Sequence, residues 1–221
     1  MYKLNNISKN FYQESWKTLL HINEKKFSVA LKNINLNIER GDIIGVTGKN
    51  GSGKSTLLKL MSGLLIPDEG TISGNENTNI SYISGNERSF FWRLTVDQNL
   101  HFFGSQYGLN KEQRNYEIEN VYCMLRIEHL KDLPFMQLST GNKKKISIAR
   151  AIVRKPDLFL FDEITSSLDS DSSENLISLI LKLHNKNSNI TTLWASHNLE
   201  EVEKISKKVL RLNNGEVESF D

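Results

Sequence analysis

The chain has 221 residues, of which 38% are apolar and 24% charged, as in an ordinary globular protein with a core of its own. A formal net charge of +2 argues against a general nucleic-acid binder, and one cysteine, Cys123, which we expect to be buried, excludes an internal disulfide. The first ten residues lack the apolar run of a secretory signal, and no stretch approaches the roughly 18 consecutive apolar residues that span a bilayer.

The first half of the chain begins with strand patterns. Residues 4–8 and 29–38 alternate apolar and polar residues, which predicts half-buried strands. The short apolar run 43–47 predicts a buried parallel strand. A glycine-rich turn follows it and leads into a helix predicted over 54–61.

The second half alternates helices and strands. Helical patterns cover about 95–130, 143–153 and 172–184, buried strands are predicted at 158–161 and 191–195, and Asn213-Asn214-Gly215 predicts a turn between two final strands. We therefore predict one α/β domain over residues 1–221, with a mainly parallel core sheet, an antiparallel β subdomain and a helical subdomain inserted at about 88–150.

Residues 48–55 fit the phosphate-binding pattern G-x-x-x-x-G-K-[ST], between a predicted strand and a predicted helix. Glycines allow the backbone amides to point inward as an anion nest, and the following helix adds its positive end. We expect Lys54 to reach the β- and γ-phosphates and Ser55 to bind Mg²⁺. The predicted nucleotide contacts are Gly48, Lys49, Asn50, Gly51, Ser52, Gly53, Lys54, Ser55 and Thr56.

Two carboxylates close the apolar run 158–161. Because ligands of open α/β sheets bind at the carboxyl ends of the strands, Asp162 is expected to hold Mg²⁺, partly through water. Glu163 is expected to orient the attacking water or accept its proton. This order of motifs predicts a P-loop NTPase.

Three further segments narrow the class. Residues 138–142 read Leu-Ser-Thr-Gly-Asn and continue into a helix with Ile148-Ala149-Arg150-Ala151, residues 165–169 follow the acidic pair, and His197 follows the last buried strand. In this order the segments resemble the signature, D-loop and switch histidine of the nucleotide-binding subunits of ABC transporters. The resemblance covers the chain from residue 48 to residue 197.

The resemblance implies ATP and Mg²⁺ as ligands, an ATP hydrolase activity and a homodimer. Ser139 and the N–H groups at Gly141 would cap the γ-phosphate of ATP bound to the other subunit, so that two ATP molecules hold the dimer together. His197 would contact the γ-phosphate and position the water. Phe11, or else Tyr12, would stack on the adenine.

The sequence departs from the family in two places. The glutamine that the family usually has after the strand ending near Ile83 is missing, and either Asn86 or Glu87 would fill its place. The signature has Thr140 for a glycine and Asn142 for a glutamine. The run Lys143-Lys144-Lys145 is interpreted as a solvated helix face rather than a site for a polyanion.

Two segments favour one branch of the family. The extra segment 13–27, with Trp16, Leu19, Leu20 and Phe27 on one helical face for core packing, and residues 87–95 resemble ATPases of bacterial ABC-2 type exporters of polysaccharides or related glycoconjugates. The aromatic run Phe90-Phe91-Trp92 lies where the family docks its membrane subunit, although burial in the core is the alternative.

This branch implies an integral-membrane ABC-2 type permease as partner and a peripheral location at the cytoplasmic face of the bacterial inner membrane. Two other readings compete with it. One is a soluble ABC ATPase that works on ribosomes or DNA, which usually carries two cassettes or a long insertion. The other is a regulatory module that binds ATP and barely hydrolyses it.

Overall fold

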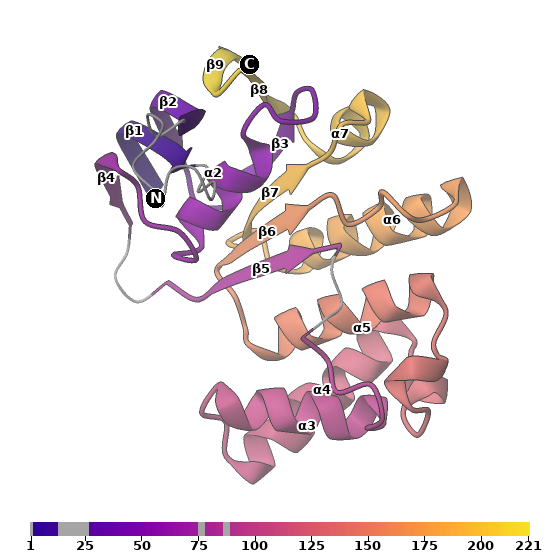
Figure 1. The fold of residues 1–221 in the computed structure, drawn as a ribbon. Helices are drawn as coiled ribbons and strands as arrows, with labels where there is room; N and C mark the ends of the chain where they lie inside the picture. The colour runs from indigo at the N-terminus through magenta and orange to yellow at the C-terminus, as the bar shows by residue number, and fades with distance from the viewer. Residues whose placement is uncertain (1, 13–26, 75–77, 86–88) are drawn as a thin grey trace, which may run out of the picture. The chain divides into compact units, whose positions relative to one another are not determined.

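The computed structural model describes residues 2–12, 27–74, 78–85 and 89–221. The chain divides into two compact units, one of Met1–Asn77 with Leu193–Asp221 and one of Thr78–Thr192. Figure 1 labels the helices and strands of both units. No helix among the described residues is long and apolar enough to cross a membrane.

The first unit contains a three-stranded antiparallel sheet in the order β2-β1-β4, built from β1 (Tyr2–Tyr12), β2 (Phe27–Ile38) and β4 (Glu69–Ser73). Its apolar side chains alternate with polar ones, as period-2 patterning requires, and Leu4, Ile7 and Ile34 are almost fully buried. This sheet is the predicted antiparallel β subdomain.

The same unit contains parallel strands. β3 (Ile43–Thr47) pairs in parallel with β8 (Lys208–Asn213), and β9 (Glu216–Phe220) returns antiparallel to β8 through Asn214 and Gly215. Both turn residues have positive φ, as the Asn-Gly turn predicts. The unit's helices are α2 (Lys54–Met61), which follows β3 and packs on β2, and α7 (Leu199–Ile205), which packs on β3.

The second unit begins with β5 (Ile80–Ser84), which pairs in parallel with β6 (Leu158–Asp162). The chain between these strands is helical, and Figure 1 shows α3, α4 and α5 gathered into one bundle. The remaining elements of this part of the chain are α3 (Val96–Gln106), α4 (Lys111–Leu125), two short 3₁₀ turns (Glu128–Leu130 and Phe135–Gln137), α5 (Thr140–Val153), α6 (Ser170–Lys186) and β7 (Thr191–Ala195). The boundary between the two units falls inside β7, after Thr192.

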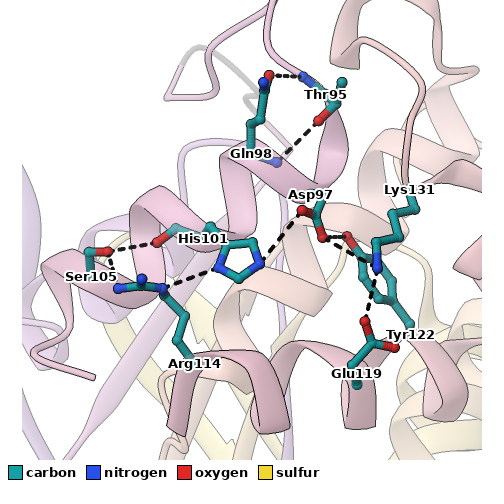
Figure 2. Close-up of polar contacts among 9 residues, drawn as sticks. All are labelled: Thr95, Asp97, Gln98, His101, Ser105, Arg114, Glu119, Tyr122 and Lys131. Carbon is teal, nitrogen blue, oxygen red and sulfur yellow. Dashed lines mark hydrogen bonds and ion pairs between the residues drawn. The ribbon is translucent and has the colours of Figure 1, made fainter. Parts of the chain in front are cut away.

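Capping boxes fix the starts of α3 and α4. Thr95 accepts a hydrogen bond from the Gln98 N–H, and the Gln98 side chain accepts one from the Thr95 N–H, as Figure 2 shows. Asn110 and Gln113 repeat the arrangement at α4. The predicted helical stretch 95–130 therefore forms two helices, because the second box begins a new helix within it.

A polar network ties α4 and the first 3₁₀ turn to α3 (Figure 2). Asp97 of α3 accepts a hydrogen bond from the Tyr122 hydroxyl at 3.0 Å and lies 3.6 Å from the ring of His101 and 4.0 Å from Lys131. Lys131 also pairs with Glu119 at 2.9 Å. Burial, and then the negative charge of Asp97, raise the pKa of Tyr122 well above its ordinary value, so the hydroxyl remains a donor.

The aromatic run after β5 splits between core and surface. Phe90 is 5% exposed and stacks on Phe135, with ring centroids 4.3 Å apart. The Arg150 guanidinium of α5 lies 4.4 Å from the Phe90 ring centroid, and burial lowers the pKa of Arg150. Phe91 and Trp92 are 44% and 46% exposed. Two of the three predicted interface aromatics are therefore accessible, and the third belongs to the core.

Three sequence-based expectations are wrong. Phe27 is not on a helical face with Trp16, Leu19 and Leu20, which lie outside the described residues: it begins β2, opposite Tyr12, and is exposed. Cys123 is exposed on α4. Lys144 is 1% exposed, because consecutive residues of a helix point in different directions and this one faces inward.

The predicted α/β fold class is confirmed by these elements, with parallel pairing in the core strands, a separate antiparallel sheet and helices between β5 and β6.

Replacing Phe90 tests the aromatic core of the helical bundle. Phe90→Ala is expected to lower the free energy of unfolding by about 3–5 kcal/mol, because it leaves a cavity between Phe135 and Arg150. Urea-induced unfolding measures this loss. The matched control, Phe91→Ala, removes a ring that is 44% exposed and should cost much less. Equal losses in the two variants would contradict the assignment of Phe90 to the core.

Candidate active site

The glycine-rich loop 48–53 connects β3 to α2 in a conformation that side chains would block. Gly48, Gly51 and Gly53 all have positive φ. A Cβ atom at Gly53 would lie 2.6 Å from the Ala30 carbonyl oxygen, and one at Gly48 would collide with the Leu212 carbonyl oxygen. The loop is therefore pressed against β2 and β8, and glycine is required at both positions.

Lys54 begins α2 and points back along this loop. Its side chain is buried, 4% exposed, and its Nζ donates to the carbonyl oxygens of Gly48 at 2.8 Å and Lys49 at 3.3 Å. The buried Ser52 hydroxyl has no hydrogen-bond partner among the described residues. A loop of glycines with positive φ, a helix start and one buried lysine form the kind of cradle that binds phosphate groups.

His197 belongs to the same unit as the loop. Its neighbour Ser196 donates its N–H to the Val46 carbonyl of β3 at 3.1 Å, so β7 ends beside the strand that leads into the cradle. His197 is exposed there and is the second residue after β7. The first unit thus places His197 close to the end of the strand that leads into the cradle.

Phe11 lies near the end of β1, 43% exposed and opposite Ser28 of β2. Ala30, which backs Gly53, is two residues further along β2. The ring therefore belongs to the strand pair that supports the cradle. Its predicted alternative, Tyr12, is also exposed, at 64%.

The acidic pair lies in the second unit, at the end of β6. Asp162 is buried, 7% exposed, and one of its oxygens, Oδ2, accepts a hydrogen bond of 2.6 Å from the Tyr82 hydroxyl of β5. Burial, and then this bond, raise the pKa of Tyr82 far above its ordinary value, so Tyr82 keeps its proton and stays a donor. Tyr82 therefore orients the carboxylate of Asp162.

Glu163, the next residue, has an unusual backbone conformation. Its φ is +48°, in the left-handed region that non-glycine residues rarely occupy. The Glu163 carbonyl accepts hydrogen bonds from the Ser166 N–H at 3.3 Å and the Ser166 hydroxyl at 2.9 Å, which close the turn. Strain of this kind gathers at functional sites, where the surrounding structure holds it.

The signature residues form one wall of an open hollow of about 380 Å³. Ser139 caps α5 by accepting a hydrogen bond from the Asn142 N–H at 3.3 Å, and Gly141 lies in the first turn. The opposite wall comes from the start of α6, where Asp169 is the N-cap and accepts bonds from the Ser172 N–H and hydroxyl, which lower the pKa of Asp169. The lining residues are Ser139, Thr140, Gly141, Asn142, Lys145, Ser167, Leu168, Asp169, Ser172, Asn175 and Leu176.

The residues present fit a magnesium nucleotide. No group of three or more His, Cys, Asp or Glu side chains arranged for a metal occurs in the part of the chain that the structure describes. Mg²⁺ does not need one, because it is usually held by one or two protein oxygens together with phosphate oxygens and water. Within the second unit Asp162 offers a carboxylate oxygen, and within the first unit Ser55 offers a hydroxyl.

Sequence patterns did not identify two residues that lie near the acidic pair, Tyr82 and Lys144. Tyr82 sits in a strand, where a tyrosine is ordinary, and Lys144 sits in a run of three lysines. Only the pairing of β5 with β6, and the packing of α5 on β5, bring them to Asp162 and to Gly85. Asn86 and Glu87, the predicted replacements for the family's glutamine, lie outside the described residues.

Comparison with protein families decides between the classes of P-loop NTPase. The family described as "ABC transporter" matches residues 31–166, which include the cradle, the signature and the acidic pair. The chain belongs to the ABC transporter family. As a member of this family of ATP-binding cassettes it binds ATP with Mg²⁺ and is an ATP hydrolase.

Curated relatives agree with this assignment. The chain is 33% identical over 204 residues to the ABC transporter ATP-binding protein NatA of Bacillus subtilis, covering 88% of this chain and 82% of the relative. It is 31% identical to the methionine import ATP-binding protein MetN 2 of Listeria innocua, over 86% of this chain. The chain spans only 59% of that second relative's length.

Solved structures share the fold over nearly all of the chain. A dimeric post-hydrolysis state of the ATP-binding cassette MJ0796, bound to ADP and Pi, has a TM-score of 0.81 and 26% identity, covering all of this chain and 98% of that one. CbiO1 from Clostridium perfringens, part of the transporter complex cbiONQ, has a TM-score of 0.83 and 26% identity, covering 99% of this chain and 87% of that one.

Removing the Tyr82 hydroxyl tests its hold on Asp162. In Tyr82→Phe, the Mg²⁺ concentration that gives half-maximal ATP hydrolysis should rise about tenfold, because the carboxylate loses a partner that orients it. Binding of Mn²⁺ to the protein–ATP complex, followed by electron paramagnetic resonance, should weaken in parallel. ATP binding without a divalent metal serves as the control and should not change. Unaltered metal dependence would contradict an orienting role for Tyr82.

Proposed function

We propose that the chain is the ATP-hydrolysing subunit that energises an ABC transporter through a separate membrane permease. The observation that carries the proposal is the set of ABC motifs held on defined elements: a glycine cradle between β3 and α2, an acidic pair at the end of β6, and a signature serine that caps α5. The relatives named above, all ATP-binding parts of transporters, support it.

In this proposal the first unit binds the nucleotide's phosphates. The backbone amides of residues 48–53 and the start of α2 surround the β- and γ-phosphates, and Lys54 exchanges its bonds to loop carbonyls for bonds to phosphate oxygens. Ser55 is a Mg²⁺ ligand, Phe11 stacks on the adenine, and His197 contacts the γ-phosphate.

The second unit supplies the carboxylates for hydrolysis. Asp162, oriented by Tyr82, serves the magnesium site, and Glu163 orients the attacking water and accepts its proton. Bound Mg²⁺ would neutralise charge that develops on the phosphate oxygens. The strained turn fixes the backbone of Glu163, so that its side chain extends from a defined position, as general-base catalysis requires.

The signature hollow supports the proposal that the chain forms a dimer. The hollow has helix starts on both sides, those of α5 and α6, and its lining is mostly polar. The start of α5 presents N–H groups and the Ser139 hydroxyl, which suit the γ-phosphate of an ATP carried by a second copy of the chain. We propose a homodimer closed by two ATP molecules, as the resemblance implies.

The exposed aromatics after β5 are the proposed contact for the permease. Phe91 and Trp92 remain accessible although their neighbour Phe90 is buried, and Met136 is 55% exposed. Lys143 lies 4.6 Å from the Trp92 ring centroid and holds that side chain in place. Rigid aromatic anchors of this kind carry much of the binding energy of protein interfaces.

The cargo that we propose is a polysaccharide or related glycoconjugate, exported through an ABC-2 type permease at the cytoplasmic face of the bacterial inner membrane. Its support is the resemblance of segments 13–27 and 87–95 to such exporters. The names of the relatives reported above do not mention polysaccharide, and one of them is a methionine import protein. Methionine uptake is therefore the alternative activity to measure in any test of cargo.

The first test replaces the proposed base. Glu163→Gln should reduce ATP turnover by about a hundredfold or more while ATP binding persists, because the amide cannot accept the proton from water. Size-exclusion chromatography should then show an ATP-dependent dimer. Undiminished turnover would sink the role of Glu163, and a wild-type protein that turns over no faster than the variant would favour the regulatory module.

The second test concerns the cargo. Deleting the gene in the organism that encodes it should remove the polysaccharide from the cell surface, and restoring the wild-type chain, but not the Glu163→Gln form, should return it. Surface polysaccharide is measured alongside methionine uptake. Loss of uptake with an unchanged surface would overturn the export proposal in favour of import.

A further inference from the structure

The buried side chain of Lys144 is the starting point. Lys144 lies in the second turn of α5, five residues after Ser139, and is 1% exposed. Taking an ammonium group out of water is unfavourable unless hydrogen bonds or an opposite charge compensate, so lysine is rarely buried in a core without such a partner. Its neighbours Lys143 and Lys145 are both partly exposed.

The ammonium group of Lys144 donates a hydrogen bond to a backbone carbonyl close to the acidic pair. Lys144 Nζ donates to the Gly85 carbonyl oxygen at 2.6 Å. Gly85 is the first residue after β5, and Ser84 before it is paired with Asp162 in the parallel register. The bond therefore fastens α5 to the backbone level with the acidic pair.

Gly85 provides the room that this lysine occupies. A Cβ atom built on Gly85 would lie 3.3 Å from Lys144 Nζ and 3.5 Å from the Glu163 carbonyl oxygen. A side chain at this position would crowd the ammonium group and would lie in van der Waals contact with the turn that holds Glu163. The missing side chain at Gly85 and the buried cation of Lys144 thus fit each other as a pair.

We propose that Lys144 is a positioning residue for ATP hydrolysis, which fixes Gly85, directly after β5, and the adjoining Glu163 turn to the signature helix α5. The link has a direction, because α5 begins with Ser139 and Gly141 at the signature hollow and reaches Gly85 one turn later. A displacement at the start of α5 is transmitted through Lys144 to the backbone beside Glu163. Lys144 acts on hydrolysis through this turn and not by touching ATP.

The test measures turnover and nucleotide affinity separately. Lys144→Met should lower kcat by about tenfold to a hundredfold, as expected when a reacting group is misplaced by about an ångström, while the dissociation constant for ATP changes by less than about twofold. Affinity is measured in the Glu163→Gln background, where ATP is not consumed. Lys144→Arg, which keeps a donor, should recover part of the lost turnover.

Two further variants separate positioning from folding. Gly85→Ala crowds the ammonium group from the other side and should lower kcat in the same direction, and combining it with Lys144→Met should give less than the product of the two effects. Lys155→Met, which removes a mostly exposed lysine two residues after the same helix together with its ion pair to Glu117, is the matched control and should leave basal turnover unchanged.

Unchanged kcat in Lys144→Met would overturn the proposal, as would multiplicative effects in the double variant. If Lys144→Met does not fold, Gly85→Ala and Lys144→Arg carry the test, and normal kcat in both of these would overturn it.

Discussion

The glycine loop between β3 and α2 is the constraint on which the nucleotide site depends. Its backbone is pressed so closely against Ala30 on one side and Leu212 on the other that no Cβ atom fits at Gly53 or Gly48. The packing of two strands thereby fixes the directions of the loop's amide groups before any phosphate arrives. A preformed cradle costs less ordering on binding than a loop that must close around its ligand.

In the second unit, neighbouring side chains hold the catalytic candidates in place. Its catalytic candidates sit on strand ends and helix starts, and each is held by a neighbour: Asp162 by Tyr82, and the Glu163 turn by Ser166. The helical bundle contributes rigidity through the capping boxes, the Asp97 network of Figure 2 and the stack of Phe90 on Phe135. Groups that must act within a fraction of an ångström are thus supported by packed or hydrogen-bonded side chains.

The sequence predicted best those features that one segment encodes by itself. The strand 43–47, the helix 54–61 and the turn at Asn214-Gly215 depend on local apolar patterning and glycines, and the structure has them at those residues. The bond between Tyr82 and Asp162 spans 80 positions, and the bond between Lys144 and Gly85 spans 59. No local pattern marks such partners, because strand pairing and helix packing decide which residues meet. The same reason explains why a run of three lysines suggested a solvated face.

The contacts between the glycine loop and residues 208–220 affect how the chain folds during synthesis. The Ser52 carbonyl accepts the Gly215 N–H, and the ion pair between Asp42 and Lys208 joins residues 166 positions apart. During synthesis the loop region leaves the ribosome long before these partners exist. Until they arrive, β3 lacks its neighbour β8 and has unpaired backbone groups that can join wrong partners. A chain interrupted before this hairpin would contain every nucleotide-binding motif and still lack the contacts of Leu212 and Gly215 that shape the loop.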